Sequence, residues 1–166
     1  SAALFLPDAK GNPGKPYRDC DNVLGFRDAD GRLPPAVEAA NAQTQCAVAV
    51  CRAVAAHGGV FIAETPARRR KGDLDETPGC ERHAHMFDHP LWVALAQETN
   101  ASMVVFDQCR LLDDEAAAVA TGPKATALLS SDAAASHVSA IFGNLRCRHP
   151  PRTHRAIRGT VGGGTV

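Results

Sequence analysis

Glu64 is the residue whose type and position most directly suggest chemistry. It follows the short apolar run Val60–Ala63, which lies between a glycine pair and Pro66. A run of this kind is typical of a buried strand in a parallel sheet. Ligands of α/β sheets bind where the carboxyl ends of strands meet, so Glu64 is a candidate reactive or hydrogen-bonding group. The alternative is a structural carboxylate that caps a loop or pairs with Arg68.

A second group of polar residues follows another apolar run. The strand predicted at Ala101–Asp107 ends on an aspartate, and Gln108 and Cys109 come directly after it. These side chains are expected to open on the same crevice as Glu64, where Asp107 would orient Lys124 or a ligand. A turn aspartate and a buried thiol are the simpler alternative.

The C-terminal region contains a pattern of metal-ligating side chains. Cys147, His149 and His154 follow the spacing Cys-x-His-x4-His. Cysteine thiolate and neutral histidine are good zinc ligands, and a structural zinc site has four of them. Cys109 or Cys80 would supply the fourth ligand. Zinc is therefore one prediction for this segment, and a loop without metal is the other.

A second histidine cluster lies in a polar stretch. His83, His85 and His89, with Cys80 close by, resemble a metal set by composition. A solvated loop is the simpler interpretation, because the surrounding residues are polar.

Arginine side chains suggest contacts with phosphate. The basic run 68–71, which begins with Arg68, could hold a DNA backbone, or it could be a solvated run balanced by the acidic residues after it. Arg148 and Arg152 could contact phosphates, because the guanidinium group binds them with two parallel hydrogen bonds, or they could face solvent.

The elements that position these residues alternate between helix and strand. Helical periodicity and capping residues predict helices at Pro35–His57, Pro90–Thr99 and Asp132–Phe142. Apolar runs predict strands at Val60–Ala63, Ala101–Asp107 and Lys124–Ser130. We expect the first two strands to pair in parallel through a right-handed crossover, and the third to pair antiparallel with the second as an edge hairpin. Residues 1–34 are predicted to be an irregular linker, and residues 159–166 a flexible glycine-rich tail.

Composition excludes some classes of protein. The 166 residues are 45% hydrophobic and 22% charged, as in ordinary globular domains, and the formal net charge is zero. Bulk, charge-driven nucleic-acid binding is therefore not expected, although a local basic patch is compatible with these numbers. No apolar stretch is long enough to span a membrane. We expect an intracellular protein, in cytoplasm or nucleus, whose six cysteines are mostly reduced thiols.

Taken in order, these motifs resemble the C-terminal half of a DNA cytosine-C5-methyltransferase-like family of the phage and retroelement-polyprotein type. In that family a helix precedes a strand ending in Glu-Asn-Pro, and a short helix with a tryptophan follows. A strand ending in Asp-x-Cys, a Lys-x-Thr strand and a Cys/His segment complete the pattern. The corresponding stretches are Gly59–Pro66, His89–Trp92, Phe106–Arg110, Lys124–Leu129 and Cys147–His154.

The resemblance implies a fold and a set of site residues. The fold is α/β, a partial Rossmann-like, methyltransferase-type three-layer sandwich of three to four strands, spanning residues 35–158. Glu64 would contact the edge of an extruded pyrimidine and assist nucleophilic attack. The residues implied on the substrate side are Thr65, Arg68, Asp107, Gln108, Lys124, Thr126, Arg148 and Arg152.

The chain also departs from the family. It reads Glu64-Thr65-Pro66 in place of Glu-Asn-Pro, and residues 111–122 replace a short turn before Lys124. The half that would carry the S-adenosylmethionine loop and the nucleophilic cysteine has no counterpart here. The sequence therefore predicts a fragment or remnant that is inactive alone. Its expected partners are DNA, the substrate of the parent family, and the missing N-terminal half of the same polypeptide. The alternative is a nonenzymatic module that binds nucleic acid or protein through a basic, zinc-stabilised segment.

Overall fold

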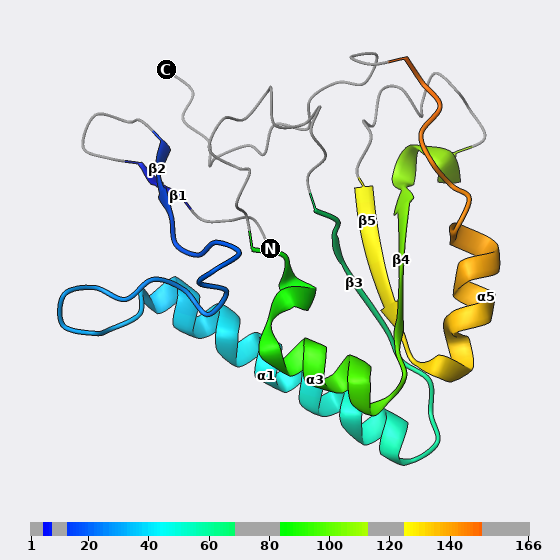
Figure 1. The fold of residues 1–166 in the computed structure, drawn as a ribbon, viewed down its shortest axis with the longest axis horizontal. Coiled ribbons are helices and arrows are strands. Elements are labelled where there is room, and N and C mark those ends of the chain that lie inside the picture. The colour runs from blue at the N-terminus through cyan, green and yellow to red at the C-terminus, as the bar shows by residue number, and fades with distance from the viewer. Residues whose placement is uncertain (1–4, 8–12, 69–83, 113–124, 151–166) are drawn as a thin grey trace.

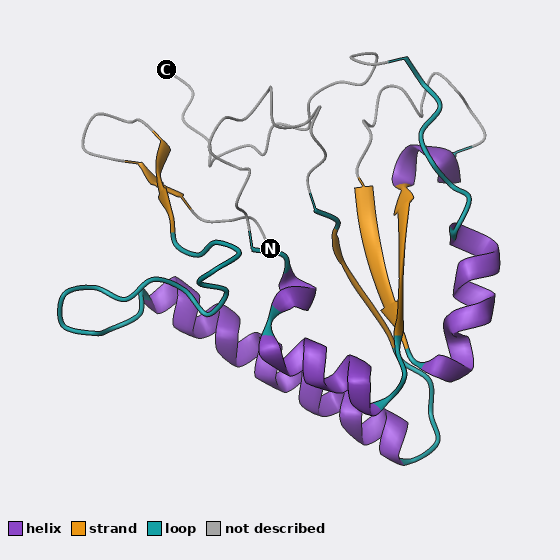
Figure 2. Cartoon of the chain, in the orientation of Figure 1, coloured by secondary structure: helices purple, strands orange, loops and turns teal. Residues whose placement is uncertain are grey.

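The structure is a computed structural model that describes residues 5–7, 13–68, 84–112 and 125–150 (Figure 1). A small hairpin comes first, formed by β1 (Phe5–Pro7) and β2 (Pro13–Pro16). The main sheet contains β3 (Ile62–Pro66), β4 (Ser102–Asp107) and β5 (Ala125–Ser130). The helices are α1 (Pro35–Ala56), α3 (Pro90–Glu98) and α5 (Asp132–Phe142), with short 3₁₀ helices η1 (Met86–Asp88) and η2 (Gln108–Leu111) (Figure 2). The hairpin was not predicted, because its glycine- and proline-rich sequence reads as loop.

The main sheet has the order β3-β5-β4, and β5 runs antiparallel to both neighbours. The predicted antiparallel pairing of the Lys124–Ser130 strand with the Ala101–Asp107 strand is confirmed, but the prediction that this pair forms an edge hairpin is wrong, because β5 takes the centre of the sheet. The prediction that the first two strands pair directly is wrong: they run in the same direction, but β5 lies between them. Burial explains the order, since every residue of 126–130 is buried while Ile62, Glu64 and Pro66 of β3 are exposed. The strand that is buried along its length takes the centre of the sheet.

Strand β3 extends further along the chain than the predicted strand Val60–Ala63. Pairing with β5 continues to Pro66, which lies opposite Thr126, and the Ala67 amide then donates to the carbonyl of Ala125 at 2.8 Å. A proline is tolerated because it removes only one donor from an edge strand. Glu64 is consequently inside β3, opposite Leu128, and not in the loop after it.

Local signals at both ends of α1 explain its bounds. Pro35 occupies the first turn, where the missing amide hydrogen costs no helical bond. At the other end Gly58 adopts a φ of 74°, and its amide donates to the Ala55 carbonyl while the Gly59 amide donates to the Val54 carbonyl. This paired arrangement is the Schellman motif, which needs a left-handed residue and therefore favours glycine. It turns the chain from α1 toward β3.

Helices cover both faces of the sheet, so the domain is a small α/β structure with three layers (Figure 1). On one face, α1 and α3 lie side by side, and Val48, Trp92 and Leu95 pack on Phe61, Ala127 and Leu129. On the other face, α5 contacts β4 and β5, and its Ala134 and Val138 pack on Phe106 and Leu128. Successive side chains of a strand point to opposite faces of the sheet. Ala127 and Leu129 of β5 therefore belong to one core, and Leu128 belongs to the other.

Candidate metal centre and the carboxyl edge of the sheet

The parallel direction of β3 and β4 brings their carboxyl ends to one edge of the sheet. The start of β5 lies at the same edge, because β5 runs the opposite way. This edge therefore carries Arg68 from the loop after β3, Asp107 and Gln108 from the end of β4, and Thr126 from β5, whereas Glu64 lies two residues before the end of β3. In open α/β sheets this is the edge where ligands bind.

The predicted residues at this edge differ in exposure. Glu64 is exposed, on the face of the sheet that also carries Leu128 and Val104. Thr65 and Thr126 are buried, with 3% and 0% of their surfaces exposed. Glu64 can therefore reach a ligand in solution, whereas the two threonines contribute to the interior of this structure.

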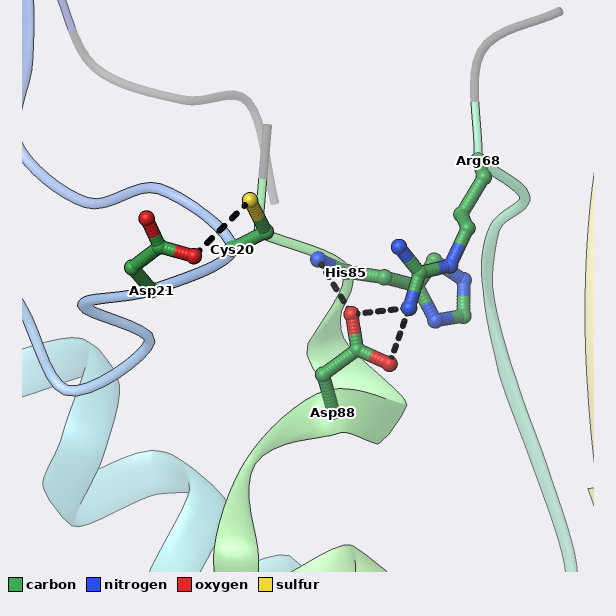
Figure 3. Close-up of polar contacts among 5 residues, drawn as sticks. All are labelled: Cys20, Asp21, Arg68, His85 and Asp88. Carbon is green, nitrogen blue, oxygen red and sulfur yellow. Dashed lines mark hydrogen bonds and ion pairs between the residues drawn. The ribbon is translucent and has the colours of Figure 1, made fainter. Parts of the chain in front are cut away.

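Arg68 forms an ion pair with Asp88, which η1 presents to the end of β3 (Figure 3). One terminal nitrogen of Arg68 lies 2.5 Å from both carboxylate oxygens. Asp88 also accepts a hydrogen bond from the backbone amide of His85 at 3.3 Å. Arg68 therefore pairs with η1 and not with Glu64, which was the alternative suggested by the sequence.

Two members of the predicted histidine cluster hold local structure. His89 is the N-cap of α3, where its Nδ1 accepts from the Leu91 amide at 3.2 Å, and His85 is part of a capping box around η1. Both side chains are buried. Burial lowers the pKa of each imidazole, and the positive charge of Arg68 adds to this effect at His85 while Asp88 opposes it. His83 and Cys80 lie outside the described residues.

The end of β4 is fastened to the segment that follows α5. The Asp107 amide donates to the Leu145 carbonyl at 2.8 Å, and the Cys147 amide donates to Oδ2 of Asp107 at 2.8 Å. Asp107 is fully buried. Its main chain and side chain together hold residues 145–147 beside η2, and this contact places Cys147 near Cys109.

Cys109, Cys147 and His149 form a compact cluster of metal-ligating atoms. One ligand atom from each lies within 4.8 Å of the others, and Sγ of Cys147 is 3.3 Å from Nδ1 of His149. Cys109 is buried and the other two are half-buried. These three are members of the set predicted from the sequence. Within the described parts of the chain, Cys109, Cys147 and His149 are the set of side chains placed closely enough to hold a metal ion.

The surroundings of Cys109 favour the neutral thiol while no metal is present. Burial raises its pKa to about 11, and the hydrogen bond with Cys147 and the charges of Cys147 and Asp107 act in the same direction. A coordinated divalent cation reverses this preference, because it stabilises the thiolate directly.

The remaining predicted residues fall into two groups. Gln108 is half-buried in η2, and Arg148 is exposed beside the Cys/His cluster, next to exposed Arg146. Lys124, Arg152 and His154 lie outside the described residues. The five described cysteines (Cys20, Cys46, Cys51, Cys109 and Cys147) form no disulfide with one another.

Sequence reasoning missed a cavity of about 670 Å³ between α3 and the sheet. Phe87, Trp92, Met103 and Leu129 contribute apolar walls, and the pair of Arg68 and Asp88 lies at its rim. The helical pattern of residues 90–99 predicts that Trp92 faces inward, but it does not predict that α3 leaves part of the β4 face uncovered.

Comparison of the chain with protein-family models, with curated proteins and with solved structures found no match. Among the described helices, none combines the length and the apolar character needed to cross a membrane. The function must therefore be argued from the residues and their geometry.

Proposed function

We propose that this domain is the substrate-side, C-terminal part of a DNA cytosine methyltransferase-like domain and is inactive by itself. One observation carries the proposal: β3 and β4 run in the same direction, are connected through α3, and end at one edge, with Glu64 exposed inside β3 two residues before its end. A helix that connects two strands of the same direction is the repeating unit of doubly wound sheets. In this sheet the antiparallel β5 lies between the two strands.

Glu64 is the proposed base-contacting group. Chemistry on a base requires that the base leave the stack and that its Watson–Crick edge be read by hydrogen bonds. An exposed carboxyl group on the sheet, near the carboxyl edge, can make that contact. Arg68, Gln108 and the exposed Arg148 are proposed to approach the surrounding phosphates and sugar. We do not propose that these residues hold S-adenosylmethionine, because no glycine-rich loop follows a strand within the described parts of the chain.

A DNA-binding measurement tests this function. Fluorescence anisotropy would compare a fully paired duplex with one that contains a single unpaired cytosine, at two salt concentrations. We expect weak binding with a preference for the unpaired cytosine. Glu64→Gln should remove the preference but leave binding, and combined Arg148→Ala and Arg152→Ala should weaken binding to both duplexes. Each lost phosphate contact should reduce the slope of log K against log salt by about 0.9.

Arg52→Ala is the matched control, because Arg52 is an exposed arginine of α1 that pairs with Glu98 of α3 at 2.7 Å. It should leave both affinities unchanged. A preference that survives Glu64→Gln, or binding that is insensitive to the two C-terminal arginines, would overturn the proposal. The chain alone should transfer no methyl group from S-adenosylmethionine to either duplex.

The second candidate function is a nonenzymatic nucleic-acid-binding module whose Cys/His segment is stabilised by zinc. The observation that favours it is the cluster of Cys109, Cys147 and His149, flanked by the exposed Arg146 and Arg148. This candidate predicts that binding depends on the arginines and on metal, and that Glu64→Gln has no effect on base preference.

A further inference from the structure

We propose that Cys109, Cys147 and His149 bind one zinc ion that locks the segment after α5 onto the carboxyl end of β4. The inference is independent of the methyltransferase-like function, because it concerns how the C-terminal part of the fold is held.

The donor set fits zinc. Two thiolate sulfurs and one imidazole nitrogen are the ligands that zinc prefers, whereas magnesium and calcium prefer oxygen. Bond lengths of about 2.3 Å to sulfur and 2.05 Å to nitrogen place tetrahedral ligand atoms about 3.6–3.8 Å apart. The observed separations, 3.3 Å between Cys147 and His149 and at most 4.8 Å within the cluster, lie close to that range. Small side-chain rotations would therefore be enough to bring the three atoms around an ion.

The backbone already supports the site. Cys109 is fixed by η2, which directly follows β4, and Cys147 is held by the hydrogen bond from its amide to Asp107. Asp107 therefore acts as a positioning residue, since it holds a ligand without being a member of the cluster. Outer-shell partners of this kind commonly affect metal affinity as much as 10–100-fold.

The site joins segments that are distant in the sequence. Cys109 lies before β5 and α5, and Cys147 and His149 lie after them, so an ion here would close a loop that contains both elements. A structural role follows from this geometry. The fourth position of a tetrahedral zinc ion would be open to water.

Cobalt titration of the full chain tests the proposal. The protein would be reduced, stripped with a chelator and titrated with Co²⁺, with absorption spectra recorded under nitrogen. We expect one ion per chain, a thiolate-to-cobalt charge-transfer band and visible bands typical of tetrahedral coordination. Zinc should displace the cobalt. Cys109→Ser and Cys147→Ser should each weaken affinity at least about 10-fold.

Cys46→Ser is the matched control, because Cys46 is exposed on α1 and far from the cluster in sequence. It should bind as the unmodified chain does. The proposal would be overturned by either of two results: no stoichiometric uptake, or uptake that is unchanged in both cysteine variants. The titration of the unmodified chain remains decisive even if a variant fails to fold.

Discussion

The carboxyl ends of β3 and β4 lie at the same edge of the sheet but are built differently. Near the end of β3, Glu64 is exposed, and Arg68 makes an exposed ion pair with η1. At the end of β4, Asp107 is fully buried and accepts a hydrogen bond from the Cys147 amide, in the segment after α5. Cys147 is itself a member of the Cys/His cluster. Two acidic residues in similar sequence contexts therefore have different uses. We call the carboxyl end of β4 the closed end, because Asp107 is buried there and holds the fold together. We call the carboxyl end of β3 the open end, because it remains accessible to a ligand.

The largest effect should come from removing the buried carboxylate. Asp107→Ala leaves the Cys147 amide without its partner, so the free energy of unfolding should fall by about 3 kcal/mol. Glu64→Ala, the matched change at the open end, should stay within about 0.5 kcal/mol of the unmodified chain. Urea unfolding followed by circular dichroism measures both. Equal losses for the two variants would remove the distinction between the ends.

Metal should stabilise the closed end. Zinc at 100 times its dissociation constant should raise the free energy of unfolding by about 2.7 kcal/mol, because it binds the folded chain alone. A chelator should reverse the gain. In a thermal melt, Cys147→Ser should show no zinc-dependent shift, whereas Cys46→Ser should shift like the unmodified chain. A shift that Cys147→Ser retains would mean that the metal binds elsewhere.

Acid should destabilise the domain through the buried histidines near β3. The folded-state pKa values of His85 and His89 lie below 6.5, mainly because both rings are buried. The unfolded chain then binds more protons as the pH falls below about 6.5, so stability is full above that value and declines below it. His85→Asn should reduce the difference in unfolding free energy between pH 7.5 and pH 5. His57→Gln, at the exposed C-cap of α1, should keep the full difference. The same pH response in both variants would exclude His85 as a source.

The smallest effect should come from the exposed ion pair. Arg68→Ala should lower the free energy of unfolding by about 0.5 kcal/mol or less, since 60% of the Arg68 side chain is exposed and water screens its charge. Chemical denaturation at low and high salt measures this change. A loss of more than about 2 kcal/mol would show that the open end also carries the fold.

The helices could be predicted because they depend on local signals, and Cys147 and His149 could be named as candidate ligands from their types and spacing. Pro35 and Gly58 mark the limits of α1, and Cys147 and His149 are close in the chain. The order of the strands could not be predicted in this way. The order depends on how deeply β5 is buried between β3 and β4. The end of β3 was also predicted too early, because Pro66 indicates a strand end, whereas pairing with β5 continues to that residue. The cavity beside α3 was missed for the same reason, since it depends on how α3 sits over the sheet.

Hydrogen–deuterium exchange with and without DNA tests the central claim most directly. The probe would be the duplex with one unpaired cytosine, added to the full chain at low salt. The account predicts slower exchange at residues 62–68 and 146–150 on DNA binding, with α5 unchanged, and no slowing at 62–68 in Glu64→Gln. Protection confined to other surfaces, or none under conditions where binding is measured, would contradict a nucleic-acid site at the open end of the sheet.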